Sequence, residues 1–215
     1  EVILASDALI ISDDIYESII YDNIEFVNFA NLSAELKKRT IVLNGVSKAY
    51  SMTGWRIGYM AGPEDIIKKI DILQSQSTSN PTSISQWASV EALLGDQSVI
   101  REMVDSFTRR RKLIVDALNA VPGVRCANPE GAFYAFPNTS GVYSLPGWPE
   151  VAKKYESHTH NSSILTAYLL QEHSVAVVPG VEFGNDNNIR LSFATSDENI
   201  VKGIERIARG VSLLK

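Results

Sequence analysis

Short apolar runs that stop abruptly at an acidic residue or a glycine restrict most strongly how this chain can fold. Such runs occupy residues 8–12, 40–44 and 56–60. Their length and bounding residues predict buried β-strands. Stretches with helical spacing of apolar residues are found at residues 63–73, 83–94 and 97–121. Strands that alternate with helices predict an α/β fold, with a parallel sheet in the first part of the chain.

The pattern changes after residue 121, where short strands and turns predominate. Strands are predicted at 124–126, 132–136, 175–178 and 189–193, and helices at 164–172 and 198–213. Residues 138–163 are rich in Ser, Gly, Pro, His and Asn and are predicted to be irregular. We therefore expect a domain boundary in the helical stretch around residues 96–120, followed by a smaller α+β domain.

Composition and charge argue against several classes of protein. The net charge of −5 and the pI near 5.3 argue against a nucleic-acid or anionic-membrane binder. No apolar run is long enough to cross a bilayer. The single cysteine, Cys126, excludes an internal disulfide and is typical of a reducing, cytoplasmic compartment. Because the chain starts without a methionine and runs almost directly into a strand, we expect it to be part of a longer protein.

Several conspicuous features are assigned structural roles. His158 and His160 lack a nearby third histidine or cysteine, so no metal site is predicted. The basic run at residues 109–112 is predicted to be a solvated helix face. Trp87 has helical spacing and is predicted to lie in the core or at an interface.

Three candidate functional positions follow the carboxyl ends of predicted strands, where α/β enzymes place their functional groups. They are Asp13 with Tyr16, then Lys48, then Arg56. Taken singly each is weak, because a lysine after a strand is usually a solvated surface residue. An acid in that position is usually a turn residue or a helix cap.

The sequence around Lys48 resembles the lysine signature of the class I and II aminotransferases, which depend on pyridoxal phosphate. Residues 45–58, Gly-Val-Ser-Lys-Ala-Tyr-Ser-Met-Thr-Gly-Trp-Arg-Ile-Gly, fit every constrained position of it. Residues 12–17, Ser-Asp-Asp-Ile-Tyr-Glu, resemble the aspartate–tyrosine segment that precedes this signature. Residues 129–134 and 189–194 resemble the two small-domain motifs, in the family's order. The residues of these motifs are most similar to those of the bacterial aspartate aminotransferase branch.

This resemblance implies a fold and a division of the chain. Residues 1–100 would be the C-terminal part of the large cofactor-binding domain, with a mixed, mainly parallel sheet. Residues 101–215 would form a long connecting helix and the small α+β domain.

The resemblance also implies roles around the cofactor. Lys48 would hold pyridoxal phosphate as a Schiff base and, once displaced, move a proton at the substrate Cα. Asp13 would pair with the pyridine nitrogen, with Asp14 as the rival carboxylate. Tyr16 would donate to the 3′ oxygen, and Arg56 would bind the phosphate.

Two residues of the second part would contact the substrate. Arg190 matches the arginine that clamps the substrate α-carboxylate in a bidentate pair. Phe133 would lie over the substrate end of the site, although an aromatic residue in a strand is as often a core residue.

The implied reaction is transamination between an amino acid and a 2-oxo acid, most simply L-aspartate and 2-oxoglutarate, in a homodimer. No arginine lies between Arg56 and Arg101 to read a second carboxylate, so the substrate stays open. An aromatic or alanine aminotransferase or a C–S β-lyase would use the same residues. The isolated chain could also be an inactive interaction module, because the family's first half is absent.

Overall fold

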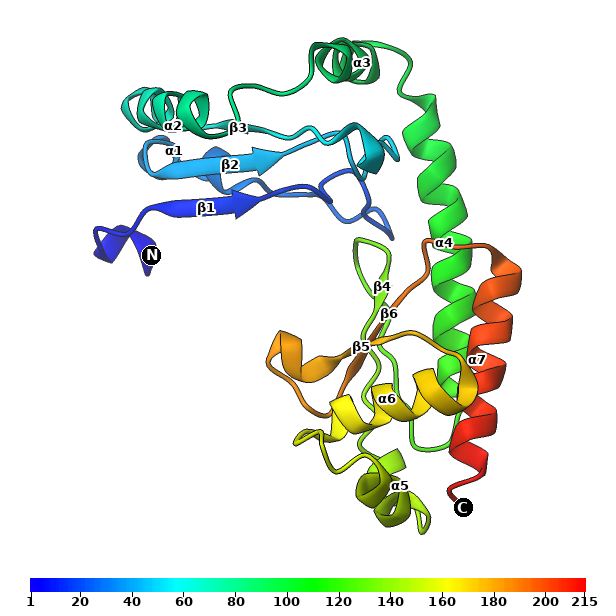
Figure 1. The fold of residues 1–215 in the computed structure, drawn as a ribbon. Coiled ribbons are helices and arrows are strands. Elements are labelled where there is room, and N and C mark those ends of the chain that lie inside the picture. Colours follow the sequence, from blue (N-terminus) through cyan, green and yellow to red (C-terminus); the bar gives the residue numbers. More distant parts are fainter. The chain divides into compact units, whose positions relative to one another are not determined.

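The first predicted strands form a small mixed sheet in the computed structural model, which describes residues 1–215. Strand β1 (Ile10–Asp13) pairs in parallel with β2 (Thr40–Asn44), and β2 pairs in antiparallel with β3 (Tyr59–Ala61) (Figure 1). The antiparallel third strand makes the sheet mixed, as the family resemblance implied, and not wholly parallel, as the alternation of strands and helices alone predicted. A parallel connection needs a crossover of a dozen or more residues, usually a helix. The β2–β3 connection, residues 45–58, is long enough for a crossover but contains no α-helix, only the short 3-10 helix η3 (Thr53–Trp55).

This sheet belongs to the first of two units, Glu1–Val104 and Asp105–Lys215. The first unit also contains η1 (Ile3–Ala5), η2 (Phe29–Asn31), α1 (Ala34–Lys37), α2 (Glu64–Ser77) and α3 (Ser83–Leu94). Helix α4 (Ser98–Asn119) begins in the first unit and ends in the second. The helix predicted at residues 83–94 is confirmed, and α2 extends four residues beyond its predicted end at residue 73. No helix is both long and apolar enough to serve as a membrane span.

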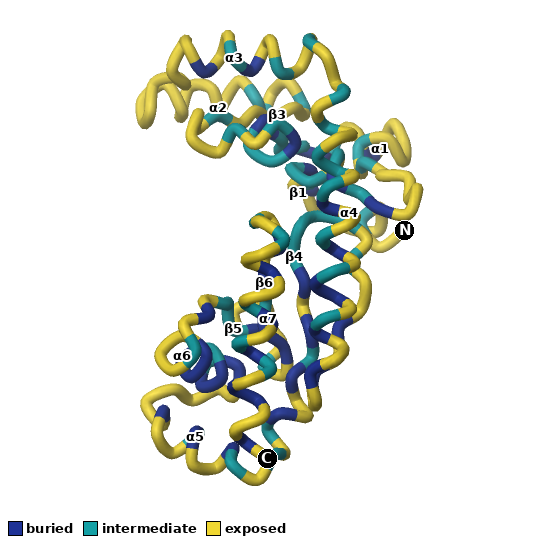
Figure 2. The backbone as a smooth tube through the Cα atoms, turned by 90° about the vertical axis from the view of Figure 1, so that its right-hand side faces the viewer, coloured by how far each residue is buried: buried dark blue, intermediate teal, exposed yellow.

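Helix α3 is exposed along most of its length (Figure 2), and several of its exposed side chains are apolar. The side chains of Ile84, Trp87 and Leu94 are 70%, 74% and 82% exposed. Within residues 1–215, Trp87 is therefore not a core residue.

The second unit is built on a three-stranded antiparallel sheet in the order β4-β6-β5 (Figure 1). Its strands are β4 (Tyr134–Ala135), β6 (Ile189–Ser192) and β5 (Val178–Pro179). The accompanying elements are η4 (Val142–Ser144), α5 (Trp148–Lys154), α6 (Asn161–His173), η5 (Gly180–Phe183) and α7 (Asp197–Ser212). Helix α7 buries Ile200, Ile204, Ile207 and Val211, one face of an amphipathic helix. The predicted α+β character is confirmed.

Two predicted segments of this unit were wrong. Residues 138–163 are not irregular, because they contain η4, α5 and the start of α6. Helix α5 has only two buried side chains, Trp148 and Val151, which is too short a pattern to reveal helical spacing. Residues 124–126 form no strand, and only Arg125 makes an isolated bridge, to Asn138.

The basic run at residues 109–112 is not a uniformly solvated face. Arg111 is only 8% exposed, and its Nη1 donates to the Pro129 carbonyl at 3.0 Å. Arg109 and Arg110 both pair with Asp197, which lies at the start of α7. Successive helical residues point about 100° apart, so four basic residues in a row cannot share one face.

A histidine lies where α6 and α7 meet. The His173 ring contacts the Tyr168 ring edge-on, with centroids 4.8 Å apart. A Cβ added at Gly210 of α7 would lie 2.9 Å from His173 Nε2. Burial lowers the pKa of His173 below its ordinary value; Arg209 acts in the same direction, and Glu172 opposes it. The fold therefore favours the neutral imidazole.

This arrangement predicts a pH-dependent stability of the second unit. Because the folded-state pKa of His173 lies below its ordinary 6.5, the unfolded chain binds more protons between the two values. The free energy of unfolding should therefore fall as the pH drops through that window. Urea unfolding at about pH 7.5 and about pH 5 measures the loss, which His173→Gln should reduce. An equal pH dependence in the wild type and the variant would contradict this assignment.

Candidate active site

Two acidic side chains at the end of β1 have very different surroundings. Asp14 is 5% exposed, and both of its carboxylate oxygens are used, by Ser12 Oγ at 2.7 Å and by Asn28 Nδ2. Asp13 is exposed and accepts only a backbone hydrogen bond, from the Ile15 N–H to Oδ1 at 3.3 Å. Of the two carboxylates, Asp13 is the one able to receive a ligand.

Tyr16 and Lys48 lie together beyond the ends of the two parallel strands. The Lys48 Nζ is 5.7 Å from the centroid of the Tyr16 ring. The turn that carries Lys48 is anchored by Val46 and Ala49, which are 0% and 8% exposed. Parallel pairing aligns Asp13 with Leu43, so both segments leave the same end of the sheet. The structure thus brings Asp13, Tyr16 and Lys48 to one edge of the first unit.

Asn44 links the two segments that carry these residues. Its Nδ2 donates to Glu17 Oε1 at 2.6 Å, and its Oδ1 accepts from the Gly45 N–H at 2.7 Å. The carboxylate of Glu17 also contributes to raising the pKa of Tyr50 and Tyr59, in both cases after the larger effect of burial. Neither Asn44 nor Glu17 was predicted as a site residue.

Arg56 lies at the end of η3 in a left-handed backbone conformation, with φ of 50°. Its side chain is exposed, and Nη1 donates to the Thr53 carbonyl at 2.7 Å. That bond leaves most of the guanidinium donors available for an anion. Gly45 is tightly enclosed, because an added Cβ would lie 3.2 Å from Gly58 Cα.

Arg190 lies in the central strand of the second unit, β6. Its Cζ is 4.5 Å from the centroid of the Tyr134 ring and 4.3 Å from that of the Phe183 ring. No carboxylate of the chain forms an ion pair with it. The guanidinium is therefore held by two aromatic rings while its charge stays available.

Phe133 packs within an aromatic cluster of the second unit. Its ring centroid is 5.3 Å from that of Phe107 and 4.9 Å from that of Tyr134. The side chain is half-buried, so it both fills the core and keeps some exposed surface. The packing role is plain, and the substrate role remains a prediction.

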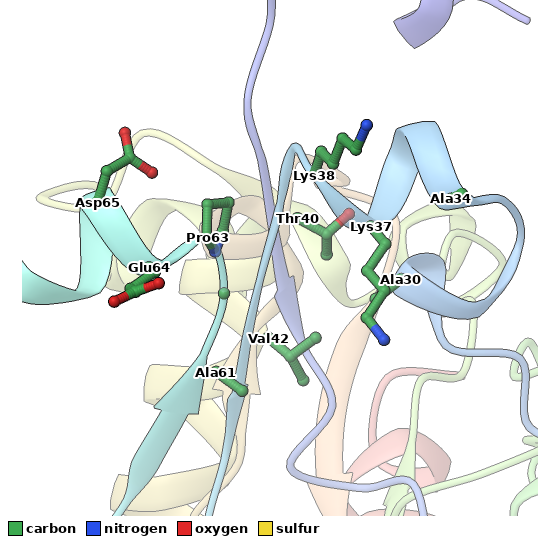
Figure 3. Close-up of a pocket in the computed structure, with 11 residues that line it drawn as sticks. Ala30, Ala34, Lys37, Lys38, Thr40, Val42, Ala61, Pro63, Glu64 and Asp65 are labelled. Atoms are coloured by element: carbon green, nitrogen blue, oxygen red, sulfur yellow. The ribbon is translucent and has the colours of Figure 1, made fainter.

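A pocket of about 750 Å³ lies elsewhere in the first unit, at the amino-terminal end of β2 (Figure 3). Thr40 and Val42 form part of its wall, with Lys37 and Lys38 from the end of α1 and Glu64 and Asp65 from the start of α2. None of the predicted site residues lines it. Its size alone therefore gives no reason to place the chemistry there.

Sequence reasoning missed the two rings that contact Arg190. Tyr134 lies in the motif at residues 129–134 but was predicted to have no role of its own, and no role was predicted for Phe183. Phe183 is distinguished only in three dimensions, as a ring that stays 46% exposed while contacting an arginine. The sequence offers no spacing signal that would have identified Phe183, which is followed by a glycine and lies seven positions before Arg190.

Comparison with known proteins agrees with the four motifs. The family described as aminotransferase class I and II matches residues 1–207. An aspartate aminotransferase of Geobacillus stearothermophilus is 46% identical over 209 residues, covering 97% of this chain and 50% of that enzyme. The chain thus spans about half the length of the curated relatives it matches.

Solved structures of aminotransferases have a similar fold. The aspartate aminotransferase of Rhizobium meliloti is 46% identical with a TM-score of 0.87, over 96% of this chain and 50% of that one. An aromatic aminotransferase of Pyrococcus horikoshii is 33% identical with a TM-score of 0.85, over 99% of this chain and 53% of that one. This chain belongs to the class I and II aminotransferase family.

Proposed function

We propose that this chain carries the lysine and the carboxylate-binding arginine of a pyridoxal-phosphate-dependent aminotransferase. The observation that carries the proposal is the position of Lys48, 5.7 Å from the Tyr16 ring, with an accessible Asp13 at the end of the parallel neighbouring strand. A lysine, a tyrosine and a carboxylate meeting at the carboxyl end of parallel strands match the position where α/β enzymes bind ligands.

The side chains present fit the cofactor's chemistry. Asp13 offers an accessible carboxylate for a protonated pyridine nitrogen, whereas the oxygens of Asp14 are already used. Lys48 offers an amine for the aldehyde carbon, and Tyr16 offers a hydroxyl for the 3′ oxygen. Arg56 offers a fork of N–H donors suited to a phosphate dianion. When bound, pyridoxal phosphate supplies an electron sink for the electrons of the substrate Cα–H bond.

The residues of the chain would then divide the work. Lys48 would take the proton from the substrate Cα and later return a proton to the product. Asp13 would keep a positive charge beside its carboxylate and so favour electron withdrawal. Arg190 would bind the α-carboxylate through paired N–H donors. Lys48 and Asp13 belong to the first unit, and Arg190 belongs to the second.

We propose L-aspartate and 2-oxoglutarate as substrates, giving oxaloacetate and L-glutamate. The support is the similarity to aspartate aminotransferases at 46% and 50% identity. A relative of Nitrosomonas europaea, 46% identical, is named an aspartate/prephenate aminotransferase, so prephenate, a 2-oxo acid with a non-aromatic cyclohexadiene ring, is the alternative acceptor. Product formation from aspartate with each acceptor in turn distinguishes the two.

We also propose that the protein is a homodimer. The support is the family match over residues 1–207, together with the apolar surface of α3, where Trp87 and Leu94 are 74% and 82% exposed in this half of the relatives' length. Exposed apolar patches of this kind mark interaction surfaces. Sedimentation of the complete gene product as a monomer at micromolar concentration would contradict the assignment.

Borohydride reduction with pyridoxal phosphate, followed by peptide mapping, tests the proposed function. The complete gene product should incorporate the cofactor on the peptide that contains Lys48. Incorporation on another lysine, or none in a folded protein, would reject Lys48 as the attachment residue. The second outcome would favour an interaction module that has lost catalysis.

A further inference from the structure

The contact of Arg190 with two aromatic rings is more specific than its proposed role alone requires. Tyr134 comes from β4 and Phe183 from the end of η5, so separate segments converge on one guanidinium. Both Cζ-to-centroid distances, 4.5 Å and 4.3 Å, are within the range of a cation–π contact. The two rings, Tyr134 and Phe183, are called the aromatic pair below.

Each ring of the aromatic pair also packs against a further aromatic ring. The Tyr134 ring is 4.9 Å from Phe133, which lies 5.3 Å from Phe107 of α4. The Phe183 ring meets Phe136 edge-on, with centroids 6.0 Å apart and an interplanar angle of 86°. Phe183 nevertheless remains 46% exposed. Its contacts with Arg190 and Phe136 account for an aromatic ring held at the surface.

The loop that presents Phe183 is fixed by hydrogen bonds. Gly180 N donates to the Asn188 carbonyl at 2.8 Å, which closes the loop between β5 and β6. Ser162, in the first turn of α6, accepts from the Val181 N–H at 3.2 Å and donates its hydroxyl to Asp186 at 2.8 Å. The Ser162 N–H also donates to Asp186, at 2.9 Å. Two residues of the loop, Val181 and Asp186, are thus hydrogen-bonded to Ser162 of α6.

Contacts of this kind orient a guanidinium without consuming its donors. An aromatic ring attracts the cation through its π-electrons and accepts no conventional hydrogen bond from the five N–H groups. An ion pair with an acid of the chain would instead compete with a bound carboxylate. Holding the planar fork in advance reduces the side-chain entropy that is lost when a ligand binds.

We propose that Tyr134 and Phe183 are positioning residues that hold the Arg190 guanidinium ready for the carboxylate of a substrate. This inference rests on the proposed function, because it takes Arg190 as the carboxylate-binding residue. It adds that the affinity for the carboxylate depends on a ring at position 183, a residue that itself makes no hydrogen bond to the ligand.

Phe183→Leu, Phe183→Tyr and Arg190→Ala in the complete gene product test the proposal, with maleate as the carboxylate probe. The matched control is Phe29→Leu in the first unit, where the side chain is 40% exposed and the substitution is the same. The readouts are the Kd for maleate and the separate kcat and KM values for aspartate and 2-oxoglutarate.

Phe183→Leu should weaken maleate binding by about 3- to 20-fold, the range of one cation–π contact, and raise both KM values with little change in kcat. Phe183→Tyr should restore both within about two-fold, and Phe29→Leu should change neither. Wild-type behaviour of Phe183→Leu beside a defective Arg190→Ala would overturn the positioning role but keep the proposed function. A Phe183→Tyr variant as weak as Phe183→Leu would also overturn it. An Arg190→Ala variant that binds maleate normally would reject the role of Arg190 as well.

Discussion

Replacement of Lys48 by alanine is expected to reduce the turnover of aspartate with 2-oxoglutarate by about a thousand-fold or more. The amine would serve twice, first to hold the cofactor and then to move a proton at the substrate Cα. Alanine removes both functions, while the turn itself should persist because Val46 and Ala49 anchor it from within. Turnover of the complete gene product under saturating cofactor measures the loss.

Two further substitutions make this result specific. Arginine at position 48 keeps the positive charge but stays protonated, so it cannot accept a proton, and Lys48→Arg should be as impaired as Lys48→Ala. Lys69→Ala removes an exposed lysine of α2 and should leave turnover unchanged. A Lys48→Arg variant that retained more than about a tenth of the activity would show that charge, rather than proton transfer, is the contribution of Lys48.

The parts of the fold that were predicted correctly are those that local sequence determines. Strand β2 and helix α3 have the predicted limits, since an apolar run or a helical period is bounded by a clear stop signal. The direction of β3 was not predictable in the same way. It depends on whether the connecting segment forms a crossover helix, and that segment forms a single 3-10 turn instead.

The candidate site, like the fold, was predicted from sequence only in part. The motif around Lys48 identified the candidate residues, but only the three-dimensional surroundings distinguish Asp13 from Asp14. Ser12 and Asn28 occupy the second carboxylate, and Asn28 lies fourteen residues away in the sequence. Hydrogen bonds over that separation leave no periodic pattern that could be recognised in the sequence.

Long-range packing also explains why the burial of Arg111 and the contact of Phe183 with Arg190 were not predicted. Arg111 is buried because one member of a continuous basic run must face inward on a helix, and its partner is the Pro129 carbonyl. Phe183 meets Arg190 because the loop between β5 and β6 folds back on itself. Neither contact follows from the spacing of the residues involved.

That loop leads to the second large effect, in which Gly180→Ala should destabilise the second unit by more than about 3 kcal/mol. A Cβ added at Gly180 would lie 2.1 Å from the Asn188 carbonyl oxygen and 2.3 Å from the Asn185 carbonyl oxygen. Both atoms belong to the backbone, so the clash cannot be relieved by turning a side chain. The loop must open, which breaks the hydrogen bond from Gly180 N to Asn188. Urea unfolding of the second unit measures the change.

The matched control is the same substitution at Gly203, which lies within α7 and has no atom within 4 Å of an added Cβ. Because alanine favours a helix over glycine, Gly203→Ala should stabilise the unit by up to about 1 kcal/mol. The opposite signs separate the steric cost at Gly180 from the general effect of replacing glycine. A Gly180→Ala variant as stable as the wild type would mean that the loop tolerates another backbone path. Phe183 would then not owe its contact with Arg190 to the close approach at Gly180.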